Sequence, residues 1–330
     1  MAAPFLTVLA TPIAGAARRL YQGMRSALRP LVKPGVPLPF SSPYPGHYAV
    51  TRSVVEGLRA NGADFNFNPR AFRQLAHVVY APANEALRQA ALLKREGRID
   101  FLAAGPTNAL FPSECDSILL MPEIDLLIVA SDWVADLLRE EAPALALKTR
   151  VSPSGVDAAY WSPSPRRTRA EAVVYWKSGD EAFCGEIERH LARHGLVPRR
   201  VRYGSYTAEQ FKTALDTAAL AVFVSQFETQ GLALAEAWSM DVPTVVWDPR
   251  GPVEWRGRTF RKGSSAPYLT PETGVAWRTL DELGAAIADV RSSRAGLRPR
   301  QWVLEHMTDA IRARAFFRVM TEATEAAVGS

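Results

Sequence analysis

Two glutamates with a glycine between them make residues 225–237 the most informative segment of the sequence. Glu228 and Glu236 are separated by seven residues, and Gly231 lies between them. Carboxylates suit the hydroxyl groups of a sugar, because each carboxylate accepts hydrogen bonds through two oxygens. A glycine that opens a helix lets free backbone amides come close to an anion, and the helix dipole adds to the attraction. These residue types predict a site that binds a phosphate group and sugar hydroxyls.

The elements expected around this segment place it at the edge of a parallel sheet. Residues 220–225 read as a buried strand and residues 232–240 as a helix, so Glu228 falls in the loop that follows the strand. Ligands bind at the carboxyl ends of the strands in open α/β sheets. The strand predicted at 172–176 should end at the same edge, where Lys177 supplies a cation.

Apolar strands and amphipathic helices alternate along most of the chain. The strands carry few polar alternations, as expected for parallel sheets that are covered on both faces. The first 45 residues are expected to be irregular, and residues 299–327 largely helical. Strands are predicted at 64–68, 77–81, 99–103, 126–130, 150–152, 172–176, 199–203, 220–225 and 244–247, and helices at 47–60, 84–96, 132–141, 180–193, 208–217 and 232–240.

A proline-rich segment at 162–167 interrupts the alternation and suits a linker between domains. A length of 330 residues also suits two domains of about 150 residues each. We therefore expect an α/β protein with two doubly wound domains. The predicted boundaries are an N-terminal domain at 1–160, a C-terminal domain at 161–300 and a terminal helix at 301–330.

Composition excludes several classes of protein. Hydrophobic residues make up 48% of the chain and charged residues 22%, which favours large cores over disorder. The longest apolar runs are far shorter than the roughly 18 residues of a membrane span. A net charge of +5 with no basic stripe and interleaved aromatics argues against a nucleic-acid partner. The two cysteines, Cys115 and Cys184, form no disulfide framework, so a cytoplasmic location is expected.

Motifs of several other kinds of site are missing from the sequence. It contains no Asp-x-Asp pair for a chelated metal, no glycine-rich nucleotide fingerprint and no Gly-x-Ser-x-Gly nucleophile segment. His190 and His194 have helical spacing but no third ligand beside them, and are read as a helix surface. Neither a metal site nor a bound cofactor is predicted.

Residues 225–246 resemble the Glu-x7-Glu motif of retaining glycosyltransferases with the GT-B fold, in particular family 4 (group 1). Residues 129–134 and 150–157 resemble the segment in which such enzymes leave their N-terminal domain. The resemblance covers about residues 126–247 and implies two Rossmann-like domains that face a central cleft, with the C-terminal helix crossing back to the N-terminal domain. The matching positions of the motif are Ser225, Glu228, Gly231, Leu232, Glu236, Ala237, Pro243, Val245 and Val246.

This resemblance implies a role for each matching residue in binding a nucleotide-sugar donor. Glu236 would bind the ribose of the nucleotide. Glu228 would contact the donor sugar and phosphate, together with the backbone amides of Gln230, Gly231 and Leu232.

The cations of the family's diphosphate site are only partly matched. The family has a Gly-Arg pair after the first strand of the second domain and a lysine five residues later. Lys177 can stand for the arginine, and no lysine occupies the second position. Arg202, Arg250 and Arg256 are candidates to replace it. The span from Lys177 to Glu228 is also one strand–helix unit shorter than in the family.

In the first domain, Gly46 and His47 occupy the place of the family's glycine-rich loop, which faces the donor or acceptor. Gly46 would allow a close approach and His47 would act near the leaving group; the other reading of His47 is a capping or surface residue. Residues 105–108 end another strand at the same edge and are either a similar candidate or an ordinary turn.

The resemblance implies a retaining, metal-independent glycosyltransferase that moves a sugar from a nucleotide-sugar donor to a glycan, lipid-linked or small-molecule acceptor. The alternative is a GT-B-like protein that binds a nucleotide or glycan without catalysis. A sugar-nucleotide isomerase of this fold is disfavoured, because its histidine-rich site is not recognisable. The arginines at positions 18, 19, 25 and 29 are expected either in a helix that touches the inner membrane peripherally or in one that packs on its own domain.

Overall fold

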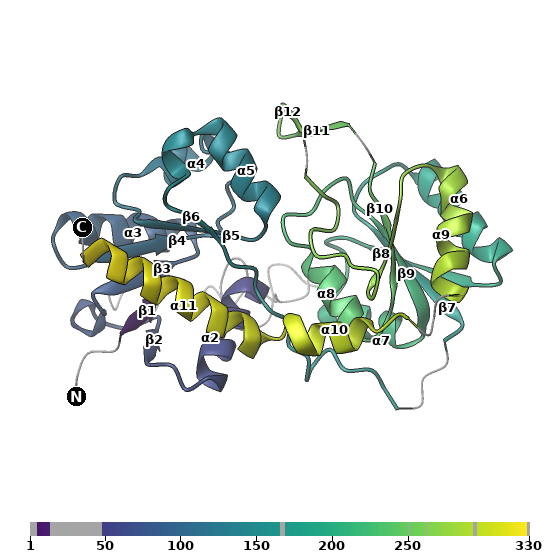
Figure 1. Cartoon of the computed structure of the whole chain (residues 1–330), viewed down its shortest axis with the longest axis horizontal. Helices are drawn as coiled ribbons and strands as arrows, with labels where there is room; N and C mark the ends of the chain where they lie inside the picture. The colour runs from purple at the N-terminus through teal and green to yellow at the C-terminus, as the bar shows by residue number, and fades with distance from the viewer. Residues whose placement is uncertain are drawn as a thin grey trace, which may run out of the picture. The chain divides into compact units, whose positions relative to one another are not determined.

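The structure is a computed structural model that describes residues 5–13, 48–165, 169–249, 251–261, 263–292 and 296–328. Gly46, His47, Arg250 and the basic N-terminal segment lie outside these described residues. The chain divides into two compact units, each built on its own parallel sheet (Figure 1). The first unit comprises Met1–Val129, Ala135–Ser152 and Ala313–Ser330, and the second comprises Ala130–Val134 and Pro153–Arg312.

Among the described residues, the first unit has a sheet of six parallel strands in the order β2-β1-β3-β4-β5-β6. All residues of β3, β4 and β5 are buried, which is why these strands read as continuous apolar runs. The strands are β1 Leu6–Val8, β2 Phe65–Phe67, β3 Val78–Ala81, β4 Phe101–Ala104, β5 Leu126–Val129 and β6 Thr149–Val151.

Strand β1 corrects the expectation that the first 45 residues are irregular. It lies between β2 and β3, with Leu6 opposite Phe65 on one side and Val78 on the other. Leu6 and Val8 are fully buried in the core of the unit. Three residues are too few for a periodic pattern, so the strand is defined by its place in the sheet and not by its local sequence.

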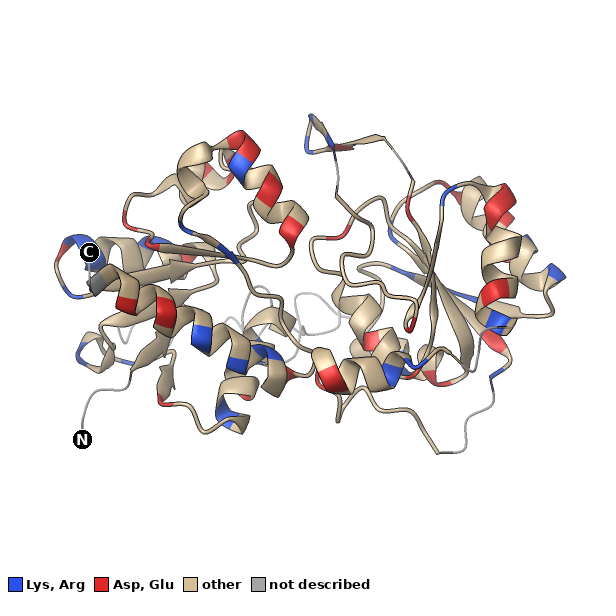
Figure 2. Cartoon of the chain, in the orientation of Figure 1, with Lys and Arg blue, Asp and Glu red and all other residues tan. Residues whose placement is uncertain are grey.

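Helices α2, α3 and α11 of the first unit each bury one face. α11 contributes Ala313, Phe316 and Met320 to the core, and the Phe316 ring lies 4.7 Å from that of Tyr80 on β3. Between these core positions α11 carries arginines, and acidic residues follow toward its end (Figure 2), so it presents no continuous basic stripe. The helices are α2 Tyr48–Ala60, α3 Asn84–Arg95, the short α4 Glu114–Ser117, α5 Asp132–Glu141, which begins in the second unit, and α11 Asp309–Val328, of which the part from Ala313 belongs here.

Within the described part of the chain, the second unit has a five-stranded parallel sheet in the order β13-β10-β9-β7-β8. A separate antiparallel hairpin, β11–β12, follows β10. The sequence reading missed this hairpin, β13 and α9. The strands are β7 Glu171–Trp176, β8 Val197–Arg202, β9 Ala218–Val224, β10 Thr244–Trp247, β11 Pro252–Trp255, β12 Arg258–Arg261 and β13 Gly274–Trp277.

Helices cover both faces of the second sheet, as the doubly wound prediction requires. α6 and α9 pack on the face that carries Val174 and Val222. α7, α8 and α10 pack on the opposite face, which carries Tyr175 and Phe223. These helices are α6 Glu181–Arg193, α7 Ala208–Asp216, α8 Leu232–Ser239, α9 Leu280–Ser292 and α10 Pro299–His306.

Helix starts in this unit follow ordinary capping chemistry. The Asp180 side chain accepts a hydrogen bond from the Phe183 amide at the start of α6. Thr207 and Gln210 form a reciprocal capping box at the start of α7. Among the helices that the structure describes, none is both long enough and apolar enough to cross a membrane.

Candidate active site

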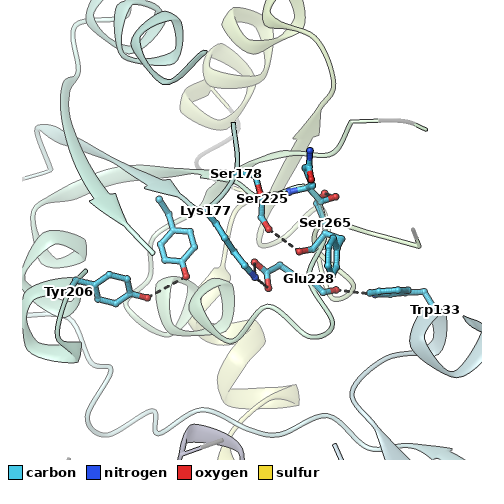
Figure 3. Close-up of polar contacts among 10 residues, drawn as sticks. Trp133, Lys177, Ser178, Tyr206, Ser225, Glu228 and Ser265 are labelled. Atoms are coloured by element: carbon cyan, nitrogen blue, oxygen red, sulfur yellow. Dashed lines mark hydrogen bonds and ion pairs between the residues drawn. The ribbon is translucent and has the colours of Figure 1, made fainter. Parts of the chain in front are cut away.

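Lys177 and Glu228 meet at the carboxyl edge of the second sheet (Figure 3). Strands β7 and β9 are neighbours, with Trp176 opposite Val224, and the Lys177 amide donates to the Val224 carbonyl at 2.9 Å. The Lys177 ammonium lies 2.9 Å from each oxygen of the Glu228 carboxylate. The structure therefore brings these two predicted residues into direct contact.

This ion pair is shielded from water but remains within reach of a ligand. The side chains of Lys177 and Glu228 are 25% and 16% exposed. The Lys177 ammonium also lies 4.9 Å from the centre of the Tyr203 ring, which adds a cation–π contact. Partial desolvation strengthens the attraction between the two side chains, so the Lys177 cation is held at the sheet edge.

Backbone and hydroxyl hydrogen bonds fix the loop that carries Glu228. Its amide donates to the Ser264 carbonyl at 3.2 Å. The Ser265 hydroxyl donates to the Gln226 carbonyl at 3.0 Å, and the Gln226 amide donates to the Ser178 hydroxyl at 3.2 Å. The carboxylate thus projects from a preorganised backbone.

Residues 130–134, which belong to the second unit, hold the far side of the same loop. The Trp133 indole N–H donates to the Glu228 carbonyl at 3.0 Å (Figure 3), and the Ser131 hydroxyl donates to the Thr229 carbonyl at 2.6 Å. A side chain on Gly263 would collide with Trp133, because its Cβ would lie 1.9 Å from that of the tryptophan. The glycine is therefore required for this packing.

Gly231 is the N-cap of α8, and Leu232 is the first residue of the helix. The φ of Gly231 is +81°, in the left-handed region, and a Cβ on this residue would approach the Leu234 side chain to 2.8 Å. The start of α8 therefore lies beside Glu228, and the dipole of a helix start is able to attract an anion.

The side chain of Gln230 has a structural role, because it is hydrogen-bonded to the backbone of another loop. It is 6% exposed and forms two hydrogen bonds with the Ser154 backbone, accepting from the amide at 3.0 Å and donating to the carbonyl at 2.7 Å. Any contact of Gln230 with a donor therefore falls to its backbone amide, as the resemblance implies.

Glu236 lies half-buried on α8, and its charge acts on two tyrosines, Tyr175 and Tyr206, that the sequence reading missed. The Tyr206 hydroxyl donates to the Tyr175 hydroxyl at 3.3 Å. Burial above all, and then the charge of Glu236, raise the pKa of Tyr206; burial, Tyr206 and the charges of Glu228 and Glu236 raise that of Tyr175. Both carboxylates thus act on the same tyrosine pair.

Two of the additional arginine candidates, Arg202 and Arg256, lie in the described part of the chain. Arg202 ends β8, and its guanidinium lies 5.0 Å from the centre of the Trp176 ring. Arg256 lies in the turn of the β11–β12 hairpin, 5.3 Å from the Trp255 ring centre. Neither guanidinium donates a hydrogen bond to the Glu228 carboxylate among the described contacts.

The glycine of the predicted turn at 105–108 is explained by the packing of two strands. Gly105 follows β4, and a Cβ at this position would lie 2.3 Å from the Ile128 carbonyl oxygen on β5, so close packing of two strands requires the glycine. Over the residues that the structure describes, no three His, Cys, Asp or Glu side chains are grouped so that they would hold a metal ion.

Solved structures with a similar fold span almost the whole chain. Sucrose-phosphate synthase from Thermosynechococcus elongatus has a TM-score of 0.53 at 13% identity, and the match covers 98% of this chain and 100% of that one. The apo form of the lipopolysaccharide outer core galactosyltransferase WaaB has a TM-score of 0.53 at 11% identity, covering 96% and 98%.

A third structure is the catalytic domain of starch synthase IV from Arabidopsis thaliana bound to ADP and acarbose. Its TM-score is 0.52 at 11% identity, and the match covers 86% of this chain and 79% of that one. No protein-family model matches the sequence, and no curated protein is similar to it. At these identities the similarity establishes the fold: the chain has the GT-B fold, with two Rossmann-like units on parallel sheets.

Proposed function

We propose that this protein is a glycosyltransferase that moves a sugar from a nucleotide-sugar donor to a glycan, lipid-linked or small-molecule acceptor. The observation that carries the proposal is the Lys177–Glu228 pair beside the glycine-opened start of α8. A cation, a helix N-terminus and a carboxylate at one sheet edge match the diphosphate and the sugar hydroxyls of such a donor. The similarity to structures of sugar-transferring enzymes supports the same activity.

Each residue has a role in the proposal that follows from its chemistry. Lys177 and the first amides of α8 neutralise the diphosphate. Glu228 accepts hydrogen bonds from hydroxyls of the donor sugar, and Glu236 accepts them from the ribose. Gly231 lets the donor come close to the backbone.

The ion pair must open when the donor binds. In the free protein the Lys177 ammonium is occupied by both oxygens of Glu228. The donor diphosphate replaces the carboxylate on Lys177, and the released carboxylate is then available to the sugar. Donor binding thus replaces the Lys177–Glu228 ion pair by an ion pair between Lys177 and the diphosphate.

We propose a transfer with retention on one face of the sugar, without a bound metal. The bond between the anomeric carbon and the diphosphate oxygen breaks, and its electron pair stays with the diphosphate. The acceptor oxygen bonds to the anomeric carbon on the same face, and its proton passes to the departing diphosphate oxygen. Lys177 and the α8 amides stabilise the negative charge that grows on the leaving group.

A donor-hydrolysis assay tests this function without knowledge of the acceptor. The purified chain is incubated with UDP-glucose, UDP-galactose, ADP-glucose and GDP-mannose, and free nucleoside diphosphate is measured. We expect slow release from at least one donor, loss of that release in Glu228→Ala, and its retention in Glu209→Ala, which changes an exposed glutamate of α7. Binding of a donor without release would instead establish the non-catalytic alternative.

A further inference from the structure

The β11–β12 hairpin (Figure 1) is anchored on the loop that carries Glu228. Val253 and Phe260 lie opposite each other in the hairpin, and both are buried. The Phe260 ring lies 5.5 Å from the ring of Phe227, the residue that directly precedes Glu228. Aromatic packing therefore fixes the hairpin against this loop.

Hydrogen bonds also fix the chain on both sides of the hairpin. The Asp248 side chain, which comes before it, accepts from the amide of Ser265, which comes after it, at 3.2 Å. The carbonyl of the neighbouring Ser264 accepts from the Glu228 amide, also at 3.2 Å. The two ends of the hairpin are thus joined to each other and to the Glu228 loop. A molecule bound at the hairpin would be held close to that loop.

Trp255 and Arg258 lie on the face of the hairpin that packs on Phe227. They are opposite each other, two positions nearer the turn than the buried pair, and residues two apart on a strand share a face. The Trp255 ring lies 5.4 Å from the Phe227 ring, and the residue is 37% exposed. This face therefore presents part of an indole, together with a guanidinium, next to the Glu228 loop.

Arg256, in the turn of the hairpin, adds a second cation at a strained position. Its guanidinium lies 5.3 Å from the centre of the Trp255 ring. Its φ of +51° is in the left-handed region, and asparagine, aspartate or glycine is the usual residue at this position of a two-residue hairpin turn. An arginine in a strained turn beside a partly exposed tryptophan points to a role in binding.

The side chains of Trp255, Arg256 and Arg258 form a patch that we call the hairpin tip. Guanidinium groups bind phosphate through paired N–H donors, and an indole offers an apolar face to the C–H groups of a sugar ring. Residues 251–261 contain three arginines and one glutamate, so the charge of the hairpin also favours an anion. A sugar that carries a phosphate group supplies a partner for each of these side chains.

The apolar side chains of the hairpin argue against a lipid surface as the partner. Val253 and Phe260 are buried, and Trp255 packs on Phe227 with only part of its surface exposed. Binding to a lipid surface depends on the apolar area that can enter it. The observations therefore favour a phosphorylated glycan over a membrane.

We propose that the hairpin tip binds the acceptor, and that this acceptor is a glycan that carries a phosphate group. The phosphate binds to Arg256 and Arg258, and a sugar ring packs on Trp255. This inference rests on the proposed function and names the class of acceptor. The donor remains at Lys177 and the start of α8, so both substrates are held against the loop of Glu228.

Binding of the full chain to a glycan array tests the inference. The probes end in mannose 6-phosphate, N-acetylglucosamine 6-phosphate or glycerol phosphate, and the controls are the same glycans without phosphate and glycans that end in glucuronic acid. Each is measured with and without saturating UDP, ADP or GDP. We expect at least one phosphorylated probe to bind about 10-fold more tightly than its unphosphorylated form. Binding should weaken as salt is added, because salt screens exposed charges.

Variants of the hairpin tip show whether it makes this contact. Arg256→Gln/Arg258→Gln should weaken binding of the phosphorylated probe about 10- to 100-fold, because hydrogen bonds to a charged group are lost. Arg256→Lys/Arg258→Lys should keep part of the affinity, since the charge remains. Arg189→Gln removes an exposed arginine from α6 of the same unit and should leave binding unchanged. Thermal unfolding checks that each variant is folded.

The outcomes separate this inference from the function on which it rests. Equal binding of phosphorylated and unphosphorylated probes would overturn the inference, and so would a phosphate preference that survives in Arg256→Gln/Arg258→Gln. Binding to vesicles of phosphatidylglycerol and phosphatidylcholine, without binding to a phosphorylated probe, would overturn it in favour of a lipid surface. No release of nucleoside diphosphate from any donor, with glycan binding intact, would overturn the proposed sugar transfer and leave the glycan site in place.

Discussion

In the proposed function the chemistry of the site depends on Lys177, whose ammonium is paired with the Glu228 carboxylate in the structure. Both oxygens of the carboxylate lie 2.9 Å from the ammonium. A nucleoside diphosphate without a sugar would form an ion pair with Lys177, but it must first displace the Glu228 carboxylate. The affinity for the nucleoside diphosphate is therefore lowered by the free energy needed to break the Lys177–Glu228 ion pair.

Replacing Glu228 by glutamine should tighten the binding of a free nucleoside diphosphate. The neutral amide no longer competes for Lys177, and a partly exposed ion pair is worth roughly 1 kcal/mol, so we expect a gain of about 3- to 10-fold. Calorimetry with UDP, ADP and GDP measures it. Glu209→Gln is the matched control on the surface of α7 and should leave the affinity unchanged. Weaker binding in Glu228→Gln would show that the carboxylate helps to hold the diphosphate.

Glu236→Ala should weaken nucleotide binding while the fold stays intact. The ribose hydroxyl loses a hydrogen bond to a charged acceptor, which is worth roughly 1.5–3 kcal/mol. The same titrations measure the loss, and a thermal-unfolding curve checks the fold. An unchanged affinity would remove Glu236 from the site.

The sequence was sufficient to place residues that come directly after a predicted strand. Lys177 and Glu228 each follow a buried strand, and parallel strands end at one edge, so their meeting was predictable. Tyr206 was not, because it lies in the turn before α7 and reaches Tyr175 only through the pairing of β8 with β7. The two hydrogen bonds between Gln230 and Ser154 join residues 76 apart, and no local pattern contains them.

At the scale of elements, the start of α8 sets the geometry of the site. The chain leaves β9, carries Glu228 through a fixed loop and enters the helix at Gly231. The left-handed backbone of Gly231 directs the first turn of α8 toward that loop. A change at this glycine should therefore affect both stability and nucleotide binding.

Gly231→Ala should destabilise the protein by about 1–3 kcal/mol, because a side chain is strained at this φ and its Cβ collides with Leu234. Gly185→Ala is the matched control. Gly185 lies inside α6 with nothing within 4 Å of its missing Cβ, so alanine there should stabilise by roughly 0.5–1 kcal/mol. Urea unfolding of both variants makes the comparison. Equal effects would show that the left-handed turn carries no strain.

Length alone did not decide which elements were predicted, since the three-residue strands β2 and β6 were expected and the 13-residue helix α9 was missed. The apolar strand β9 and the amphipathic helices α3 and α6 lie within a few residues of their predicted bounds. β1 and β13 contain three and four residues, and both were missed; β1 pairs with β3, and β13 pairs with β10. The β11–β12 hairpin turns at Arg256-Gly257, where both residues have positive φ, a turn signal that was overlooked.

At the scale of the whole molecule, the C-terminal helix is part of the first core. Residues of α11 from Ala313 onward belong to the first unit, although α11 begins in the second. Phe316 is 2% exposed and packs on Tyr80 of β3. Stability of the first unit thus depends on the last residues of the chain.

Phe316→Ala should cost about 3–5 kcal/mol in the unfolding of the first unit, because a buried ring leaves a cavity. Phe72→Ala is the control in the same unit, since Phe72 is 42% exposed and should cost far less. Urea unfolding followed by circular dichroism reports the change. A loss in Phe316→Ala no larger than in the control would show that α11 is not needed for the core.

The central claim is that Lys177 stabilises the leaving diphosphate in a sugar transfer, and single-turnover cleavage of the donor at saturating concentration tests it most directly. We predict that Lys177→Ala lowers the rate about 10²–10³-fold, with a smaller change in donor affinity, because the charge on the leaving group grows toward the transition state. Lys177→Arg should keep part of the rate because its charge remains. Lys212→Ala, a change on α7, should be as fast as wild type. A Lys177→Ala variant as fast as wild type would contradict the account.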